Sequence, residues 1–189
     1  MYYNKRVELL TSLVILITLV LLFFLLSMVW PPDSPWSPWW RTDSKRARLI
    51  CKLAKVNDKD VVYDLGSGDG ALLITAAKEY GARAVGVEID PLRVIISRLV
   101  VLFAGQSGKV KIMRENFFGA DINDATVVFM YLIPKTLARM KPKLLRELKP
   151  GAKIVTFVYK IDLPIIEEDL KNEIYLYKIP KNNSSVLSN

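Results

Sequence analysis

Two different apolar patterns divide the chain. Residues 9–30 form a nearly uninterrupted apolar run, in which four hydroxyl side chains are the polar positions and no charge occurs. From residue 43 onward, short runs rich in Val and Ile alternate with longer stretches of helical periodicity. The first pattern predicts one lipid-exposed helix, and the second predicts a folded α/β domain.

The alternating region predicts a sheet covered by helices. We expect helices over 44–56, 71–80, 91–104 and 135–148, and strands over 60–65, 83–88, 110–113, 126–131 and 153–159. The pattern then changes, because 165–170 and 173–179 flank Lys171 and Asn172 as the two arms of a hairpin do. The predicted fold is therefore an open, mostly parallel α/β sheet that ends in an antiparallel hairpin.

The apolar run matches a bilayer in length. As a helix it would measure about 33 Å, against a hydrocarbon core of about 30 Å. Trp30 at one end and Tyr2 and Tyr3 at the other suit the two interfaces. A cleaved signal peptide is the alternative, but its apolar part is usually about 7 to 15 residues long and ends at small residues. Here Trp-Pro-Pro-Asp follows the run, so we predict an uncleaved single span.

Basic residues set the expected orientation. Lys5 and Arg6 precede the span, whereas six lysines and arginines follow it between residues 41 and 55. This bias predicts a single-pass cell-membrane protein with its folded domain facing the cytoplasm and a short N-terminus outside. We divide the chain into a tail and transmembrane helix (1–30), a Pro/Trp-rich linker (31–42), the folded domain (43–180) and a polar tail (181–189).

Composition narrows the chemistry and the partners. The net charge of +8 suits anionic lipid, nucleic acid or acidic proteins, but no nucleic-acid-binding motif is present, so nucleic acid is the less favoured partner. Cys51 is the one cysteine, which excludes internal disulfides and fits a reducing compartment. The absence of histidine excludes Ser-His, Cys-His and His-metal catalysis, and we predict no metal site.

A glycine-rich turn is the strongest sign of function. Residues 61–70 read Val-Val-Tyr-Asp-Leu-Gly-Ser-Gly-Asp-Gly, and Glu88 ends the next predicted strand. Glycines let a ligand lie against bare backbone where a helix begins, and the acidic residue can accept hydrogen bonds from two ribose hydroxyls. A nucleotide site is thus predicted from Asp64, Gly66, Ser67, Gly68, Gly70 and Glu88.

The spacing of the turn favours one nucleotide. Dinucleotide sites use G-x-G-x-x-G and bind a pyrophosphate, whereas this turn is G-x-G-x-G with Asp64 before it and Asp69 inside it. Two carboxylates repel a pyrophosphate but attract a cation. S-adenosyl-L-methionine has an ammonium and a sulfonium and no phosphate, so we predict it as the cofactor. The alternative is a structural turn in which Asp69 merely caps the helix.

Further candidates follow the later strands. Asn116 can read the adenine edge with its amide, and Phe117 can cover the ring, although core packing explains Phe117 equally well. Tyr131, followed by Pro134, is the candidate for orienting the nucleophile, and a core tyrosine is the alternative. If the acceptor is lysine, its amine must be neutral, which at pH 7 costs about 4.6 kcal/mol from a pKa of about 10.4. An apolar, aromatic entrance would lower that cost.

The motifs resemble those of the seven-strand (class I) S-adenosylmethionine-dependent methyltransferases. The resemblance covers about residues 38–179 and is closest to small archaeal protein-lysine methyltransferases and their membrane-anchored mitochondrial relatives. It rests on the glycine turn with these further stretches: Leu53-Ala-Lys-Val, Ala84-Val-Gly-Val-Glu-Ile, Asn116-Phe-Phe, Ala125-Thr-Val-Val, Lys141-Pro-Lys-Leu, Glu147-Leu-Lys-Pro-Gly and Tyr175-Leu-Tyr. It implies a Rossmann-like seven-stranded sheet and transfer of methyl groups to protein lysines.

The resemblance also assigns the end of the linker, with two departures. In the family a proline-aromatic segment before the first helix lies over the cofactor, which implies that role for Trp39 and Thr42. Arg41 stands where the family has a proline, and 161–164 replaces a tryptophan-bearing loop that walls the acceptor side. From the residues alone, the linker tryptophans could equally lie on the membrane interface.

We therefore expect a membrane-anchored protein-lysine N-methyltransferase whose acceptors are membrane-associated proteins. One alternative is a methyltransferase that acts on a lipid, a quinone or another small molecule. The other is a membrane-tethered module that binds the cofactor without turnover.

Overall fold

The computed structural model describes residues 2–29 and 42–180, and it separates into two compact units, Met1–Trp39 and Trp40–Asn189. The first contains one helix, α1 (Tyr2–Val29). Its stretch Lys5–Phe23 is long and apolar enough to cross a membrane, and none of that stretch is buried. A signal sequence near an N-terminus meets the same criterion of length and composition.

The second unit contains a seven-stranded sheet with the order β3-β2-β1-β4-β5-β7-β6. Its strands are β1 (Val61–Leu65), β2 (Arg83–Glu88), β3 (Val110–Arg114), β4 (Val127–Met130), β5 (Lys153–Phe157), β6 (Ile165–Asp169) and β7 (Ile174–Lys178). The first five are parallel, and β7 pairs antiparallel with both β5 and β6. The predicted sheet and its terminal hairpin are confirmed.

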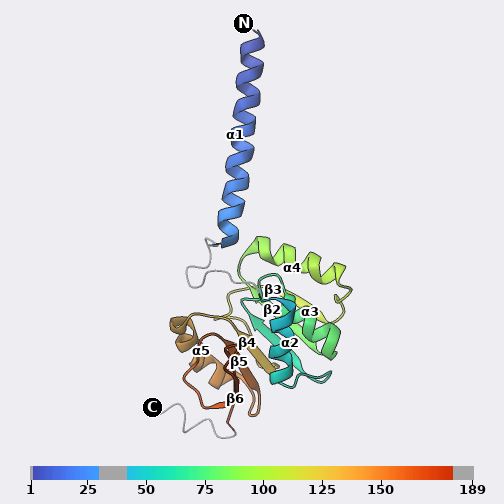
Figure 1. Ribbon diagram of the computed structural model, residues 1–189, viewed down its shortest axis with the longest axis vertical. Coiled ribbons are helices and arrows are strands. Elements are labelled where there is room, and N and C mark those ends of the chain that lie inside the picture. The colour runs from blue at the N-terminus through green and yellow to red at the C-terminus, as the bar shows by residue number, and fades with distance from the viewer. Residues whose placement is uncertain (1, 30–41, 181–189) are drawn as a thin grey trace. The chain divides into compact units, whose positions relative to one another are not determined.

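Helices cover both faces of this sheet. They are α2 (Ser44–Leu53), α3 (Ala71–Tyr80), α4 (Pro91–Phe103) and α5 (Pro134–Glu147). Side chains of α2, α3 and α4 share one core cluster with one face of the strands, and those of α5 share a second cluster with the other. Figure 1 shows α5 on the opposite side of the sheet from α2 and α3.

Local chemistry sets where the helices begin. Asp43 accepts a hydrogen bond from the amide of Arg46 and caps α2, and Asp90 does the same for Arg93 in α4. Proline occupies the first turn of α4 and of α5, where its missing amide hydrogen costs nothing.

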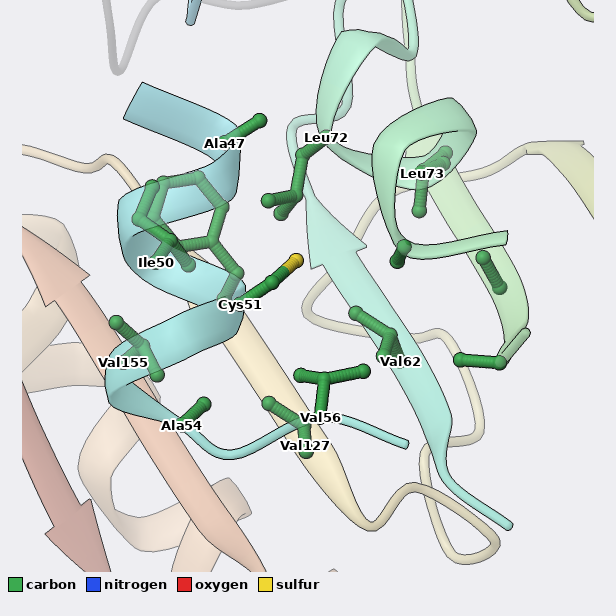
Figure 2. Packing of buried hydrophobic residues seen from close by; sticks show 14 of the residues in the cluster. Ala47, Ile50, Cys51, Ala54, Val56, Val62, Leu72, Leu73, Val127 and Val155 are labelled. Atoms are coloured by element: carbon green, nitrogen blue, oxygen red, sulfur yellow. The ribbon is translucent and has the colours of Figure 1, made fainter. Parts of the chain in front are cut away.

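The larger core cluster explains why α2 lies on the sheet. Ala47, Ile50 and Cys51 are at most 2% exposed, and Figure 2 shows Ala47 and Cys51 on the side of α2 that faces Leu72 of α3 and Val62 of β1. This apolar contact removes the side chains from water, which stabilises the fold by about 25 cal/mol per Å² of apolar surface buried. Cys51 is therefore a core residue, and burial raises the pKa of its thiol to about 12.

Several predicted elements are longer than the observed ones, and three of them end or begin early for an identifiable local reason. Helix α2 ends at Leu53 and not at residue 56, and Lys55 beyond it has a φ of +50°. The fourth strand begins at 127, because Thr126 Oγ1 accepts the amide of Val61 and binds Asp60. The fifth strand ends at Phe157, because Val158 has a φ of +65°.

Candidate cofactor and acceptor site

The candidate site lies where the strand order reverses. The sheet grows outward from β1 to β3, and the chain then returns to β4 on the other side of β1. In open α/β sheets such a reversal leaves a crevice beyond the carboxyl ends of the strands. The turn after β1 and the segment after β4 meet here, because a Cβ added to Gly66 would lie 3.8 Å from Leu132 Cδ2.

The turn after β1 is held by backbone hydrogen bonds. The amides of Gly66 and Ser67 both donate to the carbonyl oxygen of Val87, at 2.8 and 3.1 Å, and that of Gly70 donates to Ser67 O at 2.9 Å. Gly66, Gly68 and Gly70 have φ angles of +92°, +55° and +79°, which residues with a Cβ rarely adopt. The three glycines therefore let the turn adopt left-handed backbone angles, and Gly66 is its exposed glycine, whereas Gly68 and Gly70 are buried.

Glu88 ends β2 with a carboxylate that two amides orient. Its Oε2 accepts from Gly68 N and its Oε1 from Asp90 N, each at 3.0 Å. A carboxylate has about four acceptor positions, so two more hydrogen bonds remain available. Burial raises the pKa of Glu88, and backbone hydrogen bonds from Asp90, Gly68 and Ile89, together with the charge of Arg93, oppose that rise. The geometry suits an acceptor for a pair of ribose hydroxyls.

Asp64 is a buried carboxyl among negative neighbours. It is 5% exposed, and burial, followed by the charges of Glu88 and Asp69, raises its pKa to about 8. A ligand cation would favour the ionised form. Asp69 Oδ1 also accepts the amide of Ala71 at 3.3 Å, so it contributes to the start of α3 as the alternative interpretation expects.

Gly86 brings the turn close to β2. A Cβ at this position would lie 2.6 Å from both Ser67 Oγ and Leu73 Cδ1. Ser67 Oγ is buried and has no hydrogen-bond partner within the described part of the chain. Because this hydroxyl is directed at Gly86, Ser67 would contact a ligand through its backbone or after rotation of its side chain. The carboxyl groups of Asp64 and Glu88 beside the glycine turn fit a nucleoside that is a cation, and the buried Arg93 is a nearby positive charge that acts on Glu88.

The segment after β3 lies beside Glu88. The amide of Glu115 donates to the carbonyl oxygen of Glu88 at 3.0 Å. Asn116 is exposed, and its Oδ1 accepts the amide of Phe118 at 3.0 Å. Phe117 is half-buried against the α5-side core and lies 4.8 Å from the ring of Phe118. Both interpretations of Phe117 therefore stay open, because it packs on the core and keeps an exposed part.

Tyr131 directly follows β4 and is half-buried. Its ring meets that of Phe157 edge-on, with centroids 4.7 Å apart and planes at 72°. The guanidinium of Arg46 lies 5.2 Å from the Phe157 centroid. Burial raises the pKa of Tyr131, Tyr159 and Glu173 add to the rise, and Arg46 opposes it. The hydroxyl is therefore neutral near pH 7 and can both donate and accept a hydrogen bond.

The remaining predicted residues have less definite positions. Pro134 is exposed and begins α5, which accounts for it structurally. Thr42 is half-buried and directly precedes Asp43, the cap of α2. Trp39 lies outside the described residues. The roles assigned to these three residues stay predictions.

Near Tyr131 the structure places further residues that the sequence analysis did not single out. Val158 forms the centre of a three-residue turn, in which the amide of Tyr159 donates to Phe157 O at 2.8 Å. Glu173 also has a positive φ, and its carbonyl oxygen accepts the amide of Val158 at 2.8 Å. Thr156, a hydroxyl residue among the apolar side chains at the end of β5, is the one sequence feature that could have marked this segment, and its Oγ1 is buried without a hydrogen-bond partner among the described residues.

Metal chemistry has no candidate here. Within 2–29 and 42–180, no group of three or more cysteine and carboxylate side chains is arranged to hold an ion.

Comparison with known proteins decides the family. The ANTKMT methyltransferase domain matches residues 64–164. The chain is also 38% identical, over 160 residues, to a protein-lysine N-methyltransferase of Saccharolobus islandicus (strain REY15A), a match that covers 80% of this chain and 98% of that protein. The chain belongs to the ANTKMT methyltransferase domain family. It is an S-adenosyl-L-methionine-dependent methyltransferase, which confirms the predicted family and cofactor.

Other relatives differ in their acceptors. The methyltransferase is similar to the crystal structure of an RNA methyltransferase from Salinibacter ruber in complex with S-adenosyl-L-homocysteine, with a TM-score of 0.73, 36% identity, and coverage of 76% of this chain and 95% of that chain. It is also 37% identical to a mouse adenine nucleotide translocase lysine N-methyltransferase, over 50% of this chain and 42% of the relative. The chain thus spans less than half of that mouse protein.

Proposed function

We propose that this enzyme is a membrane-anchored protein-lysine N-methyltransferase. The observation that carries the acceptor assignment is the match to the archaeal protein-lysine N-methyltransferase, because it extends over 98% of that protein. The mouse adenine nucleotide translocase lysine N-methyltransferase supports the same acceptor group. In this proposal the acceptors are membrane-associated proteins, and the enzyme faces the cytoplasm.

The cofactor would be held by the turn after β1 and by the end of β2. Glu88 would accept the ribose hydroxyls with the two lone-pair positions that its amide partners leave free. Asp64 would lie toward the cationic amino-acid part, where an opposite charge would lower its raised pKa. Asn116 and Phe117 would face the adenine, and Thr42 would lie over the cofactor.

The cofactor would supply an activated methyl group, so the chain's own residues would mainly align the amine and favour its neutral form, with the ammonium proton passing to solvent water. Tyr131, with its neutral hydroxyl beside the Phe157 ring, would orient the lysine nitrogen at the end of β4. The same half-buried aromatic surface would disfavour the ammonium form of the acceptor. Glu173 is exposed on this side and carries a negative charge that would attract a lysine before it loses its proton.

The anchoring part of the proposal rests on the first unit. Helix α1 is long enough for a bilayer, and six lysines and arginines follow between residues 41 and 55. A tethered enzyme meets acceptors in the same membrane at a raised local concentration.

RNA is the second candidate acceptor. It is favoured by the 36% identity to the Salinibacter ruber RNA methyltransferase and is compatible with the net charge of +8. One experiment separates the candidates. The full chain would be incubated with methyl-labelled S-adenosyl-L-methionine, membranes and RNA from its source, followed by separation of protein, lipid and RNA.

We expect label in membrane protein, released on hydrolysis as methyl-lysine. Glu88→Ala, treated identically, should transfer none. Label confined to RNA or to lipid would overturn the acceptor assignment. Cofactor binding without transfer to any fraction would favour a non-catalytic module.

A further inference from the structure

Helix α4 has an apolar outer face, unlike a typical surface helix. In 42–180, nine large apolar side chains are exposed, and five of them lie on α4: Ile95, Leu99, Val100, Leu102 and Phe103. Phe103 is 85% exposed, and Ile95 is 56% exposed. A contiguous apolar surface of this kind usually marks an interaction site.

The charged side chains of α4 and of the segment up to the end of β3 all have the same sign. Residues 91–114 contain no acidic residue and five basic ones. Four of the five are exposed, namely Arg98, Lys109, Lys111 and Arg114. Arg98 donates to the carbonyl oxygen of Ile112 at 2.9 Å, which holds its charge beside strand β3.

We propose that the apolar face of α4, together with these four basic residues, docks on an anionic bilayer surface. We call this set of side chains the α4 face. The inference rests on the proposed membrane anchoring by α1 and adds a second, interfacial contact to it.

The chemistry of the α4 face fits a lipid interface. A helix that lies in the interface combines apolar side chains, which enter the boundary between headgroups and acyl chains, with lysines and arginines that bind anionic headgroups. Each basic residue near such a surface strengthens binding by about fivefold. A second copy of the chain is a poorer partner, because it would oppose two surfaces that carry basic residues and no acidic ones.

Chain length allows this contact. Twelve residues, 30–41, separate the end of α1 from the first described residue of the second unit. An anchored α1 would therefore keep the second unit within about 40 Å of the bilayer, since a proline-rich segment extends by about 3.1 Å per residue. At that tether length the docking contact is intramolecular and needs little intrinsic affinity.

Docking has a consequence for the reaction. Helix α4 begins one residue after Asp90, whose amide donates to Glu88 Oε1 in the candidate cofactor site. A bilayer under the α4 face would thus lie beside the crevice and bring lysines near the membrane surface within its reach.

The test uses the full chain in vesicles of phosphatidylcholine and phosphatidylserine that carry nitroxide-labelled lipid. A polarity-sensitive fluorophore is attached to Ile95→Cys or, as the matched control, to Ile166→Cys. These positions are equally exposed, at 56% and 55%, but Ile166 lies on β6 at the opposite edge of the sheet. Cys51 is 1% exposed and has a raised thiol pKa, so it should remain unlabelled.

We expect lipid nitroxides to quench the probe at 95 strongly and the probe at 166 weakly. Leu99→Glu, added to Ile95→Cys, should reduce the docked-to-free ratio by at least about tenfold, because it removes the burial of one leucine. Unchanged melting of this variant in detergent would show that the fold is intact. Replacing phosphatidylserine by phosphatidylcholine should also weaken the quenching.

Three results would overturn the proposal. A chain that does not float with the vesicles would refute the anchoring, and the docking with it. A chain that floats but shows equal quenching at 95 and 166 would refute the docking alone. The α4 face would instead bind a second copy of the chain if the probe at 95 is shielded from water but not quenched by lipid nitroxides, and if two copies of the chain crosslink to each other.

Discussion

The carboxyl edge of the sheet has two halves of different construction. At β1 and β2 the site is buried and bonded through the backbone, with Glu88 held by two amides at 3.0 Å. At β4 and β5 the site is half-exposed and formed by side chains, with Tyr131 against Phe157 and a strained turn at Val158. A left-handed φ costs about 1–2 kcal/mol for a residue with a Cβ.

The difference separates cofactor from acceptor. A cofactor that is the same for every turnover can be bound by a rigid, backbone-built half. The acceptor differs among relatives, so the half of the site that binds it is expected to be formed by side chains and loops, which can differ between sequences without loss of the fold. Changes in the first half should therefore act on cofactor affinity, and changes in the second should act on turnover.

The largest expected effect is that of Glu88→Ala. It removes an acceptor for two ribose hydroxyls, and hydrogen bonds to a charged group contribute about 1.5–3 kcal/mol each. We expect calorimetry with S-adenosyl-L-homocysteine to show at least about a hundredfold loss of affinity. Glu79→Ala, on the outer surface of α3, is the control and should bind normally. Normal binding by Glu88→Ala would refute the assignment of this half.

Gly86→Ala should destabilise the same half. The new methyl group would lie 2.6 Å from Ser67 Oγ and Leu73 Cδ1, and such overpacking costs about 1–3 kcal/mol. The melting temperature should fall by several degrees. The affinity for the cofactor should also fall, because the turn must shift to make room for the methyl group. Gly108→Ala is the matched control, because no atom lies within 4 Å of its added Cβ. Equal melting of the two variants would contradict the close packing of the turn.

The pH dependence should report on Asp64, whose pKa is raised from 3.8 to about 8. Between these values the unfolded chain is ionised while the folded carboxyl keeps its proton, so without cofactor this group makes the free energy of unfolding fall as pH rises. The ionised form binds the cationic cofactor, so affinity should rise by at most about tenfold per pH unit up to about pH 8. Asp64→Asn should make both the free energy of unfolding and the cofactor affinity less dependent on pH. An affinity independent of pH in the unmodified chain would refute this role.

The smallest expected effect is that of Tyr131→Phe, which keeps the ring contact with Phe157 and removes the hydroxyl. Loss of one positioning hydrogen bond should lower kcat by about tenfold. Cofactor affinity should not change, and Tyr80→Phe on α3 is the control. A loss of cofactor affinity in Tyr131→Phe would remove the distinction between the two halves.

The first half could be predicted from sequence because its parts are contiguous. Asp64 to Gly70 form one turn, and Glu88 ends the next strand, so spacing alone brings them together. The positive φ angles of this turn are also visible in the sequence, because glycine occupies each of those positions.

The second half could not be predicted in the same way. Arg46, Phe157 and Glu173 come from three segments distant in the sequence, and no local pattern predicts that Phe157 contacts Tyr131 or that the charges of Arg46 and Glu173 act on it. Val158 and Tyr159 favour strands, so the sequence predicts that β5 continues to 159, whereas the turn at Val158 ends it at 157. Here a tertiary hydrogen bond, from the amide of Val158 to the carbonyl oxygen of Glu173, overrides the local preference for a strand.

The most direct test of this account is a crystal structure of the chain with S-adenosyl-L-homocysteine. The account predicts both ribose hydroxyls on the Glu88 carboxylate, the amino-acid part beside Asp64, and the sulfur open toward Tyr131. A ligand bound elsewhere, with Glu88 still bonded only to the amides of Gly68 and Asp90, would contradict it.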